Sequence, residues 1–469
     1  MIMENKYLKK NNAYVKDMTE GEPLLLLFEF SIPLLIGNIF QQTYSLADSI
    51  ILGRYVGIVS LGAVGSTHTI TVFINSLTIG LSVGIGIITS HFFGAKEHKK
   101  VKNTIGNSYY IIPLTALIMG VICFIFGGMF LSLLNTPKDT LSYAVIYMRT
   151  ISVGFIPMSF FNILSSILRA LGDSKTPLFF LILSCILNIF LDFIFTLKFN
   201  LGIMGVGLAT TASQFIAAFL CFIYAEMSNS YFRLNSYDFN FSKEIFFRII
   251  KVGLPMALQY SFIAFSLIAL QRVVNEFGSD FVSSYTLVKR IELFVQYPFM
   301  SFGIAMATYT GQNIGARKVS RVKLGYLKAI ICISVFSLFI FILFQNFATN
   351  IVKIFGNDPS VIIFAVRGLK ITSSFYIFLG LIHVTRNLLN GAGDTKFSMF
   401  NGAIECISRI CLSKPLTMIP ILGVNGVWFT AGITWTLNGL FCIIRYRLGK
   451  WKTIYLTKME NKLIIVDNH

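Results

Sequence analysis

The chain has 469 residues, of which 55% are hydrophobic and only 13% are charged, whereas an average soluble domain has about 25% charged residues. Twelve membrane-spanning helices of about 20 residues need about 240 apolar positions, which this composition supplies. The composition argues against a soluble globular protein and excludes disordered, collagen-like and disulfide-scaffold chains. We therefore expect nearly all of the chain to lie in a lipid bilayer.

The net charge of +18 would suit a nucleic-acid partner only if the basic residues clustered on one face. Instead, 26 of the 39 Lys and Arg residues lie in the two chain ends and in every second predicted loop, and five lie in the loops between. Cytoplasmic segments of membrane proteins retain basic residues. This pattern predicts a multi-pass protein of the cytoplasmic (plasma) membrane, with both termini cytoplasmic and no nucleic-acid partner.

The sequence offers no conventional cofactor site. Its seven cysteines lie in apolar stretches without a Cys-X-X-Cys pair, which predicts buried small side chains rather than disulfides or metal ligands. The phosphate-loop pattern GxxxxGK[ST] is absent, so direct ATP hydrolysis is not expected. We predict no cofactor, and any transport would draw on an ion gradient.

Long apolar stretches predict twelve transmembrane helices. In chain order they lie near residues 24–50, 60–90, 104–130, 141–167, 177–197, 206–228, 252–271, 282–309, 324–348, 361–385, 397–418 and 424–444. A shift of 221 residues superposes the two halves, so that Gly-Asp-Ser-Lys at 172–175 meets Gly-Asp-Thr-Lys at 393–396. We predict an all-α integral membrane protein with two six-helix bundles related by a pseudo-two-fold axis along the membrane normal.

The repeat predicts the organisation of the chain. Its five parts are a cytoplasmic tail (1–20), an N-lobe (21–228), a cytoplasmic linker (229–245), a C-lobe (246–447) and a second cytoplasmic tail (448–469). Two lobes around a central cavity suit alternating access. Gene duplication also produces symmetrical channels and enzymes, so symmetry alone leaves those classes open.

The first two predicted helices contain three candidates for conformational or cavity roles. Pro33 cannot donate a backbone hydrogen bond, so the first helix can bend there. We expect a hinge that switches between bent and straight forms, with an ordinary structural proline as the alternative. Gln42 and His68 are weaker candidates for polar groups in the cavity.

Acidic side chains inside a bilayer cost about 2.5 to 3.5 kcal/mol each and are functional candidates by default. Asp48 lies near the outer end of the first helix, and Asp192 follows Asn188 by four residues on one face of the fifth. Thr210 enters the sixth helix from the same side. We expect these four side chains to converge in the outer half of the first lobe.

The chemistry of these four side chains predicts a site for a coupling ion. Two carboxylates, an amide oxygen and a hydroxyl are hard oxygen donors that suit Na⁺. Two carboxyl groups pressed together in a low dielectric instead hold a proton. The sequence does not choose between Na⁺ and H⁺. The alternative is an Asp at a helix end, with Asn and Thr as contacts between helices.

The second lobe departs from this pattern. The residues that correspond to Ser184, Asn188, Asp192 and Thr210 are Glu405, Arg409, Ser413 and Ala431. Glu405 and Arg409 lie four apart on one helix and are expected to form an ion pair. A fixed cation there would occupy the place of a mobile one, so we assign ion coupling to the first lobe alone.

The eighth predicted helix contains a second charged group within the bilayer. Lys289, Arg290 and Glu292 lie within four residues of one another. We expect them to form an internal network at the lobe interface. A role in contacting the substrate is the alternative.

The chain resembles the multidrug and toxic compound extrusion (MATE) family over residues 18–447. The strings that carry the resemblance are Met-Thr-Glu-Gly at 18–21, Arg-Ala-Leu-Gly-Asp-Ser-Lys-Thr-Pro at 169–177, Arg-Ile-Glu at 290–292 and Gly-Gln-Asn-Ile-Gly-Ala at 311–316. The resemblance implies an antiporter, expected to be monomeric, that exports organic cations and drug-like compounds in exchange for Na⁺ or H⁺. It also implies an ion site at Asp48, Asn188, Asp192 and Thr210, and a bending proline at Pro33. Relatives with a Glu on the seventh helix differ from this chain, which has Ser-Phe-Ile-Ala at 261–264.

Two alternatives to an antiporter stay open. A flippase for a lipid-linked precursor, from the same superfamily, would require a substrate with an acidic headgroup and a strongly cationic cavity. A polytopic membrane enzyme would require His, Cys or acidic residues gathered at one membrane face. Asp173 and Asp394 are predicted to face the cytoplasm, but their Gly-Asp-Ser/Thr-Lys turns predict helix capping instead.

Overall fold

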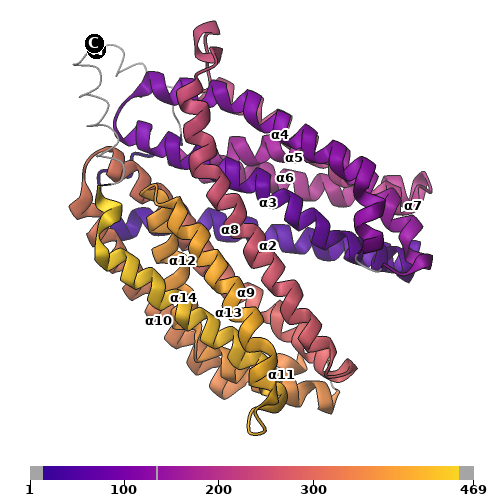
Figure 1. Cartoon of the computed structure of the whole chain (residues 1–469). Helices are drawn as coiled ribbons and strands as arrows, with labels where there is room; N and C mark the ends of the chain where they lie inside the picture. Colours follow the sequence, from indigo (N-terminus) through magenta and orange to yellow (C-terminus); the bar gives the residue numbers. More distant parts are fainter. Residues whose placement is uncertain (1–13, 134–135, 357, 454–469) are drawn as a thin grey trace. The chain divides into compact units, whose positions relative to one another are not determined.

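The computed structural model describes residues 14–133, 136–356 and 358–453. Within these residues the secondary structure is helical, without a β-strand. The α-helices are α2 (Pro23–Ile51), α3 (Ile58–Gly94), α4 (His98–Leu133), α5 (Lys138–Ala170), α6 (Lys175–Asp192), α7 (Gly202–Ser228), α8 (Lys243–Asn275), α9 (Ser279–Gly315), α10 (Val319–Lys353), α11 (Pro359–Ser373), α12 (Tyr376–Gly391), α13 (Thr395–Met418) and α14 (Gly426–Leu448) (Figure 1). Because α11 and α12 form one bent pair, these helices provide the twelve predicted spans.

Two spans are less apolar than the rest. Among the described residues, nine helices, or ten when α11 and α12 count as one, are long and apolar enough to cross a membrane by composition alone. The helices that fall short are α9 and α13, which contain the charged residues predicted to lie inside the bilayer, among them Glu292 and Glu405. Both acids are buried within the protein, so these helices can span the bilayer without exposing them to lipid.

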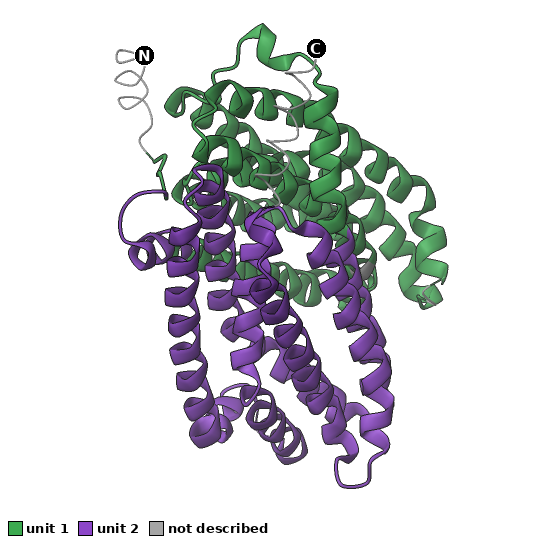
Figure 2. Ribbon diagram, turned by 60° about the vertical axis from the view of Figure 1, so that its left-hand side comes forward, with its two compact units in different colours: residues 1–18, 32–257 green, residues 19–31, 258–469 purple. Residues whose placement is uncertain are grey.

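The chain divides into two compact units (Figure 2). Unit 1 comprises residues 1–18 and 32–257, and unit 2 comprises residues 19–31 and 258–469. The division therefore falls inside α2 and inside α8, so each of these helices contributes one part to each unit. The lobe limits expected from the sequence are set by the internal repeat, whereas these units are set by compactness. The units therefore do not test the lobe limits, which stay a prediction.

The span predicted at 361–385 differs from the structure in two respects. It is broken, because α11 and α12 meet at an angle of 52°. At the break, the Phe375 ring fills the space beside Gly432 of α14, where an added Cβ would come within 2.3 Å of the ring. The second half also extends to Gly391, so Arg386 lies buried in α12 and not in a cytoplasmic loop. A charged residue lowers local hydropathy, which made this part of the helix look like a loop.

The segment that joins α7 to α8 packs against the cytoplasmic end predicted for α4. The Tyr231 hydroxyl hydrogen-bonds with His98 Nδ1 at 2.6 Å, and the Ser242 amide donates to Asn107 Oδ1 at 2.9 Å. Gly106 is required here because a Cβ would come within 2.1 Å of a carbonyl oxygen of the joining segment. The joining segment is therefore fixed to unit 1 along its length.

Small residues allow α3 and α8 to pack backbone against backbone within unit 1. A Cβ added at Gly84 would lie 2.7 Å from the Cα of Gly253, and one added at Gly80 would lie 2.3 Å from the amide nitrogen of Ala257. Each helix thus presents two small residues spaced four apart, the arrangement that lets membrane helices approach most closely.

We expect Gly84→Ala to destabilise the protein by about 1 to 3 kcal/mol, because the new methyl group must push the two backbones apart. Thermal unfolding of the purified protein in detergent measures the effect. Gly65→Ala in the same helix is the matched control, since nothing lies within 4 Å of a Cβ at that position. A Gly84→Ala protein that melts no lower than the Gly65→Ala protein would contradict the packing.

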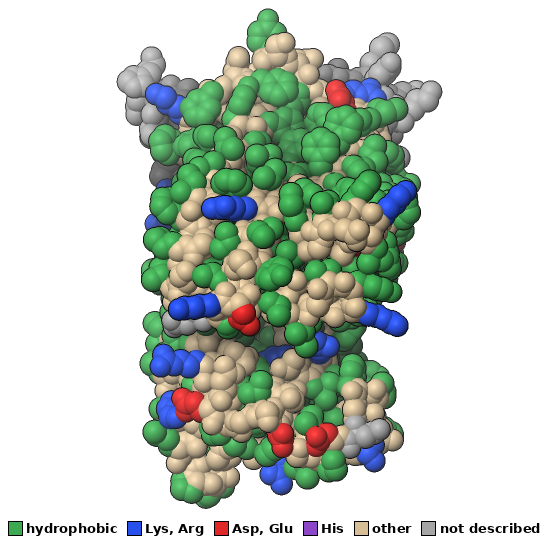
Figure 3. Space-filling model, turned by 90° about the vertical axis from the view of Figure 1, so that its right-hand side faces the viewer, with side chains coloured by type: hydrophobic (Ala, Val, Ile, Leu, Met, Phe, Trp, Pro, Cys, Tyr) green, Lys and Arg blue, Asp and Glu red, His purple; other side chains and the backbone are tan. Residues whose placement is uncertain are grey.

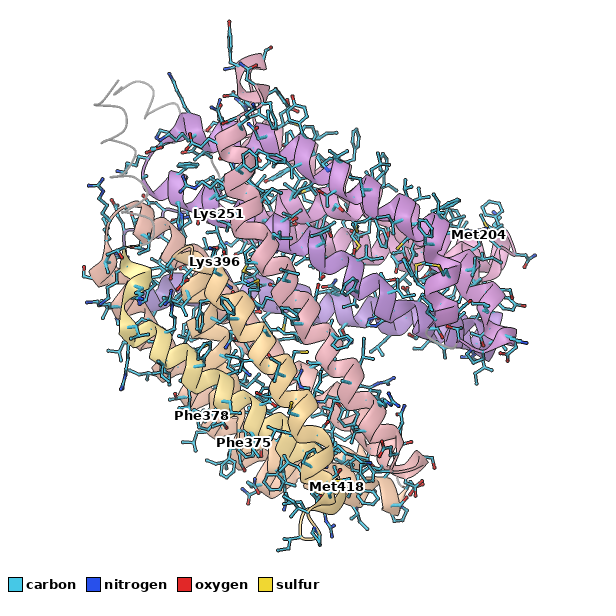
Figure 4. All side chains as sticks on the ribbon, viewed as in Figure 1. Met204, Lys251, Phe375, Phe378, Lys396 and Met418 are labelled. Atoms are coloured by element: carbon cyan, nitrogen blue, oxygen red, sulfur yellow. The ribbon has the colours of Figure 1, made fainter. Side chains whose placement is uncertain are left out.

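The surface suits a lipid environment. Hydrophobic side chains cover much of the face drawn in Figure 3, and Lys and Arg are scattered across it. Side chains project from all sides of the long helices, and Phe375 and Phe378 lie close together at the start of α12 (Figure 4). Exposed apolar side chains in such number are stable where they face hydrocarbon.

Candidate functional site

Asp48 and Asp192 meet inside unit 1. Asp48 lies near the end of α2, and Asp192 is the last residue of α6. Asp192 is 0% exposed and Asp48 is half-buried. Their carboxyl groups lie close enough to interact electrostatically, and two carboxyl groups side by side in a low dielectric favour holding a proton between them. No N–H or hydroxyl group of another described residue donates to either oxygen of Asp192.

Asn188 and Thr210 form a second contact beside the acids. Asn188 Nδ2 lies 3.4 Å from Thr210 Oγ1, and Asn188 is 2% exposed. Asn188 precedes Asp192 by one helical turn, so both side chains lie on the same face of α6. The amide oxygen of Asn188 is buried and accepts no hydrogen bond from the described residues. The structure therefore brings together all four side chains of the predicted ion site.

Two tyrosines belong to the surroundings of the acid pair. Tyr44 precedes Asp48 by one turn of α2, and Tyr147 approaches from α5. Both phenol groups lie close enough to Asp48 and Asp192 to interact with them electrostatically. Sequence reasoning missed Tyr147, because nothing in the sequence separates it from the other tyrosines of the chain.

Both acid-bearing helices continue into π-helical turns. The segment η1 (Leu52–Val56) follows α2, and η2 (Phe193–Lys198) begins directly after Asp192. The two turns contact each other, and the rings of Tyr55 and Phe193 meet edge to face with centroids 6.5 Å apart. π-helical turns are rare and occur frequently at functional sites.

Unit 2 contains a buried cluster that we call the Arg–Glu–Arg triad, formed by Arg386, Glu405 and Arg409. Arg409 Nη2 donates to Glu405 Oε1 at 2.8 Å, and Arg386 Nη1 lies 3.6 Å from Glu405 Oε2. Arg409 also donates to the Ser266 hydroxyl of α8. The ion pair within α13 is present as expected, but sequence reasoning missed Arg386.

Glu292 is the centre of a second charged cluster in unit 2. Its side chain is 0% exposed, and Oε2 accepts a hydrogen bond from Lys289 Nζ at 2.8 Å. The Tyr376 hydroxyl at the start of α12 donates to Oε1 at 3.4 Å. The Lys289 ammonium lies 5.4 Å from the centroid of the Tyr285 ring. Arg290, predicted to join this network, is exposed and forms no ion pair among the described residues.

Three further candidates lie on the first two long helices. Pro33 is buried inside α2, which continues through it. Gln42 is half-buried in the same helix, and His68 is exposed on α3.

The two Gly-Asp turns differ in what their acids do. Asp173 Oδ1 accepts hydrogen bonds from the backbone amides of Lys175 and Thr176 at 3.0 and 2.9 Å, which confirms the predicted capping of α6. Burial raises the pKa of this carboxyl group above its usual value. Asp394 does not cap α13, since its carboxylate pairs with Arg445 at 2.7 Å. Arg445 comes from α14, a partner that local sequence cannot reveal.

The cytoplasmic end predicted for α2 belongs to unit 2, and three basic residues of that unit hold it in place. The Lys328 ammonium bonds to the Glu22 carboxylate and lowers the pKa of Glu22 below its usual value. Lys318 Nζ donates to the carbonyl oxygen of Thr19 at 3.0 Å, and Arg321 Nη2 donates to that of Gly21 at 2.9 Å.

A fold of long apolar helices in two repeated units, with acids and ion pairs buried among the helices, is that of a multi-pass membrane transporter. The MatE family model matches residues 33–194 and 255–413, which is more than half of the chain. The chain therefore belongs to the MatE family, the multidrug and toxic compound extrusion transporters, and is a transporter rather than an enzyme.

Individual relatives agree with the family match. The Probable multidrug resistance protein YpnP of Bacillus subtilis (strain 168) is 30% identical over 446 residues, covering 94% of this chain and 98% of its own. A MATE solved in the bent conformation and in the straight conformation has a TM-score of 0.85 and 24% identity in each case. Both structures cover 94% of this chain, and 99% and 100% of their own. The predicted fold class is confirmed.

Proposed function

We propose that this chain is a cation-coupled antiporter that exports organic cations and drug-like compounds across the cytoplasmic membrane by alternating access, in exchange for Na⁺ or H⁺. The relative named as a probable multidrug resistance protein supports the class of exported compound. The observation that carries the coupling is the buried contact of Asp48 with Asp192 beside Asn188 and Thr210. Two negatively charged carboxylates are costly inside a bilayer, and a bound proton or Na⁺ would neutralise one of the two charges.

In the proposed cycle, the acid pair alternates between an occupied and a vacant state. With a proton, the two carboxyl groups share a hydrogen bond; with Na⁺, the carboxylate oxygens and Asn188 Oδ1 would be the ligands. Loss of the ion leaves two adjacent negative charges that repel each other in a low dielectric. Because Asp48 belongs to α2 and Asp192 to α6, this repulsion separates the two helices.

Pro33 is the proposed hinge that transmits this change. It lies 15 residues before Asp48 in the same helix, and its missing amide hydrogen leaves α2 able to bend. The bent and straight forms of the related MATE support two conformations in this fold. Neutralising the acid pair would favour one of the two forms.

The location and organisation of the chain complete the proposal. We place both termini in the cytoplasm, with tails at 1–20 and 448–469, a linker at 229–245, lobes at 21–228 and 246–447, and a single chain as the working unit. Residues 1–13 and 454–469 of the tails lie outside the described residues. The similarity to a probable multidrug resistance protein of Bacillus subtilis favours multidrug export over a flippase for lipid-linked precursors.

The decisive experiment applies the two ion gradients separately. Purified protein is reconstituted in proteoliposomes that contain a fluorescent organic cation, and export is followed under a Na⁺ gradient, a pH gradient, both, or neither. We expect one gradient to drive export and its collapse to stop it. Export that continues at the same rate without either gradient would contradict the proposal.

A further inference from the structure

The Arg–Glu–Arg triad contains more positive than negative charge. Arg386 is 7% exposed, Arg409 is 4% exposed, and Glu405, at 7%, is the acid that both contact. Arginine stays protonated in proteins, so it cannot lose its charge by releasing a proton, as a buried carboxylic acid can by binding one. The triad therefore has one excess positive charge inside the helices of unit 2.

The neighbouring groups do not neutralise this excess. Lys289 interacts electrostatically with Arg409, but its own charge is balanced by Glu292. His383 lies beside Arg386 and Cys442 beside both Arg386 and Glu405, and neither provides an opposing negative charge. Glu292 and Glu405, the two acids beside these cations, are thus already paired.

Two hydrogen-bond donors of the triad are unused. Arg386 Nη1 is buried and lies 3.6 Å from Glu405, beyond hydrogen-bond distance. Arg409 Nε is also buried and has no acceptor among the described residues. A buried donor without a partner costs about 1 to 3 kcal/mol, and more when it is charged. Both atoms therefore lack an acceptor, and an acceptor with a negative charge would satisfy them best.

Unit 1 shows that the repeated fold does not require this charge. At the offset of the repeat, the residues corresponding to Arg386, Glu405 and Arg409 are Ser165, Ser184 and Asn188. All three are buried and uncharged. The excess charge is therefore a property of unit 2, and a purely structural need of the fold does not explain it.

We propose that unit 2 binds a single anionic group on Arg386 Nη1 and Arg409 Nε. The group is either a free chloride ion or the carboxylate of a zwitterionic compound that the protein transports. The carboxylate source rests on the proposed export function, whereas the chloride source does not. The site thus has the opposite charge preference to the acid pair of unit 1.

The chloride source is tested on the purified full-length protein in detergent. The melting temperature is measured in sodium chloride and in sodium methanesulfonate, whose anion has no carboxylate and coordinates weakly, at equal concentration and pH. Because a ligand that binds only the folded state raises its stability, we expect a saturable rise with chloride. Arg386→Gln should abolish it while leaving the Glu405–Arg409 pair neutral. Lys414→Gln, which removes a cation paired with Glu276 on the exposed side of α13, should retain it.

The carboxylate source is tested by export from proteoliposomes. A zwitterionic compound with a carboxylate is compared with its methyl ester, which keeps the cationic group alone. We expect Arg386→Gln to lower export of the zwitterion at least about tenfold relative to the ester, with Lys414→Gln unchanged. Should Arg386→Gln fail to fold, Arg386→Lys replaces it and should weaken both effects, since lysine lacks the planar fork of donors.

The outcomes separate this site from the proposed function. A chloride-dependent shift that Arg386→Gln removes supports the chloride source even if no compound is exported. A selective loss of zwitterion export supports the carboxylate source. Equal melting temperatures of the unsubstituted protein in chloride and methanesulfonate, together with no selective loss of zwitterion export, would overturn the proposal and leave the triad as an internal ion-pair network.

Discussion

Asp192→Asn is expected to abolish ion-driven export while the protein still reaches the membrane and folds. Asparagine has nearly the same volume as aspartic acid, so the packing at the end of α6 is preserved. The asparagine side chain cannot bind or release a proton near neutral pH, and it is a weaker ligand for a cation. Without a titrating or charged partner for Asp48, the acid pair cannot alternate between its occupied and vacant states.

The measurement is export of a fluorescent cation from proteoliposomes under the gradient that drives the unsubstituted protein. Asp280→Asn is the matched control, because the same chemical change there affects an exposed residue in the first turn of α9. Equal amounts of each protein in the liposomes are verified on gels. Full export by Asp192→Asn would refute the assignment of the ion site.

Glu405→Gln is expected to cause the largest loss of stability. The change removes the acid that both Arg386 and Arg409 contact, and it leaves two buried guanidinium groups without a counter-charge. Breaking a buried ion pair by removing one partner costs about 3 to 5 kcal/mol. Denaturation of the purified protein in detergent should therefore show a much lower melting temperature.

Glu276→Gln provides the comparison for this loss. Glu276 forms an ion pair with Lys414, but both side chains are nearly half exposed. An exposed pair of this kind contributes about 0 to 1 kcal/mol. If Glu405→Gln melts no lower than Glu276→Gln, the triad is more hydrated than its burial indicates and the charge argument for unit 2 fails with it.

The spans were predictable because a bilayer requires long apolar stretches and leaves little room for other patterns. The helix break at Ser374–Phe375 was not, because neither Gly nor Pro marks it. The Phe375 ring packs at the break against Gly432, a neighbour far along the chain that local sequence does not reveal. The same limit applies to Arg386. Its burial is acceptable only because Glu405 lies within reach, and no hydropathy scan contains that information.

The acids of the candidate site were predictable because a charged side chain stands out within an apolar stretch. A carboxylate within an apolar stretch is conspicuous because its transfer to lipid is costly, so Asp48 and Asp192 could be found without coordinates. The four-residue spacing then added Asn188. Tyr147 and the π-helical turns η1 and η2 required the structure, because they reflect how α2, α5 and α6 pack rather than any local composition.

The membership of residues 19–31 in unit 2 has a consequence for biosynthesis. Their contacts with Lys318, Arg321 and Lys328 join positions about 300 residues apart. At about 5 to 20 residues per second, the ribosome needs roughly 15 to 60 seconds to reach those three basic residues after the start of α2 has emerged. The beginning of the first helix to enter the bilayer must therefore wait without its native partners until α10 is made.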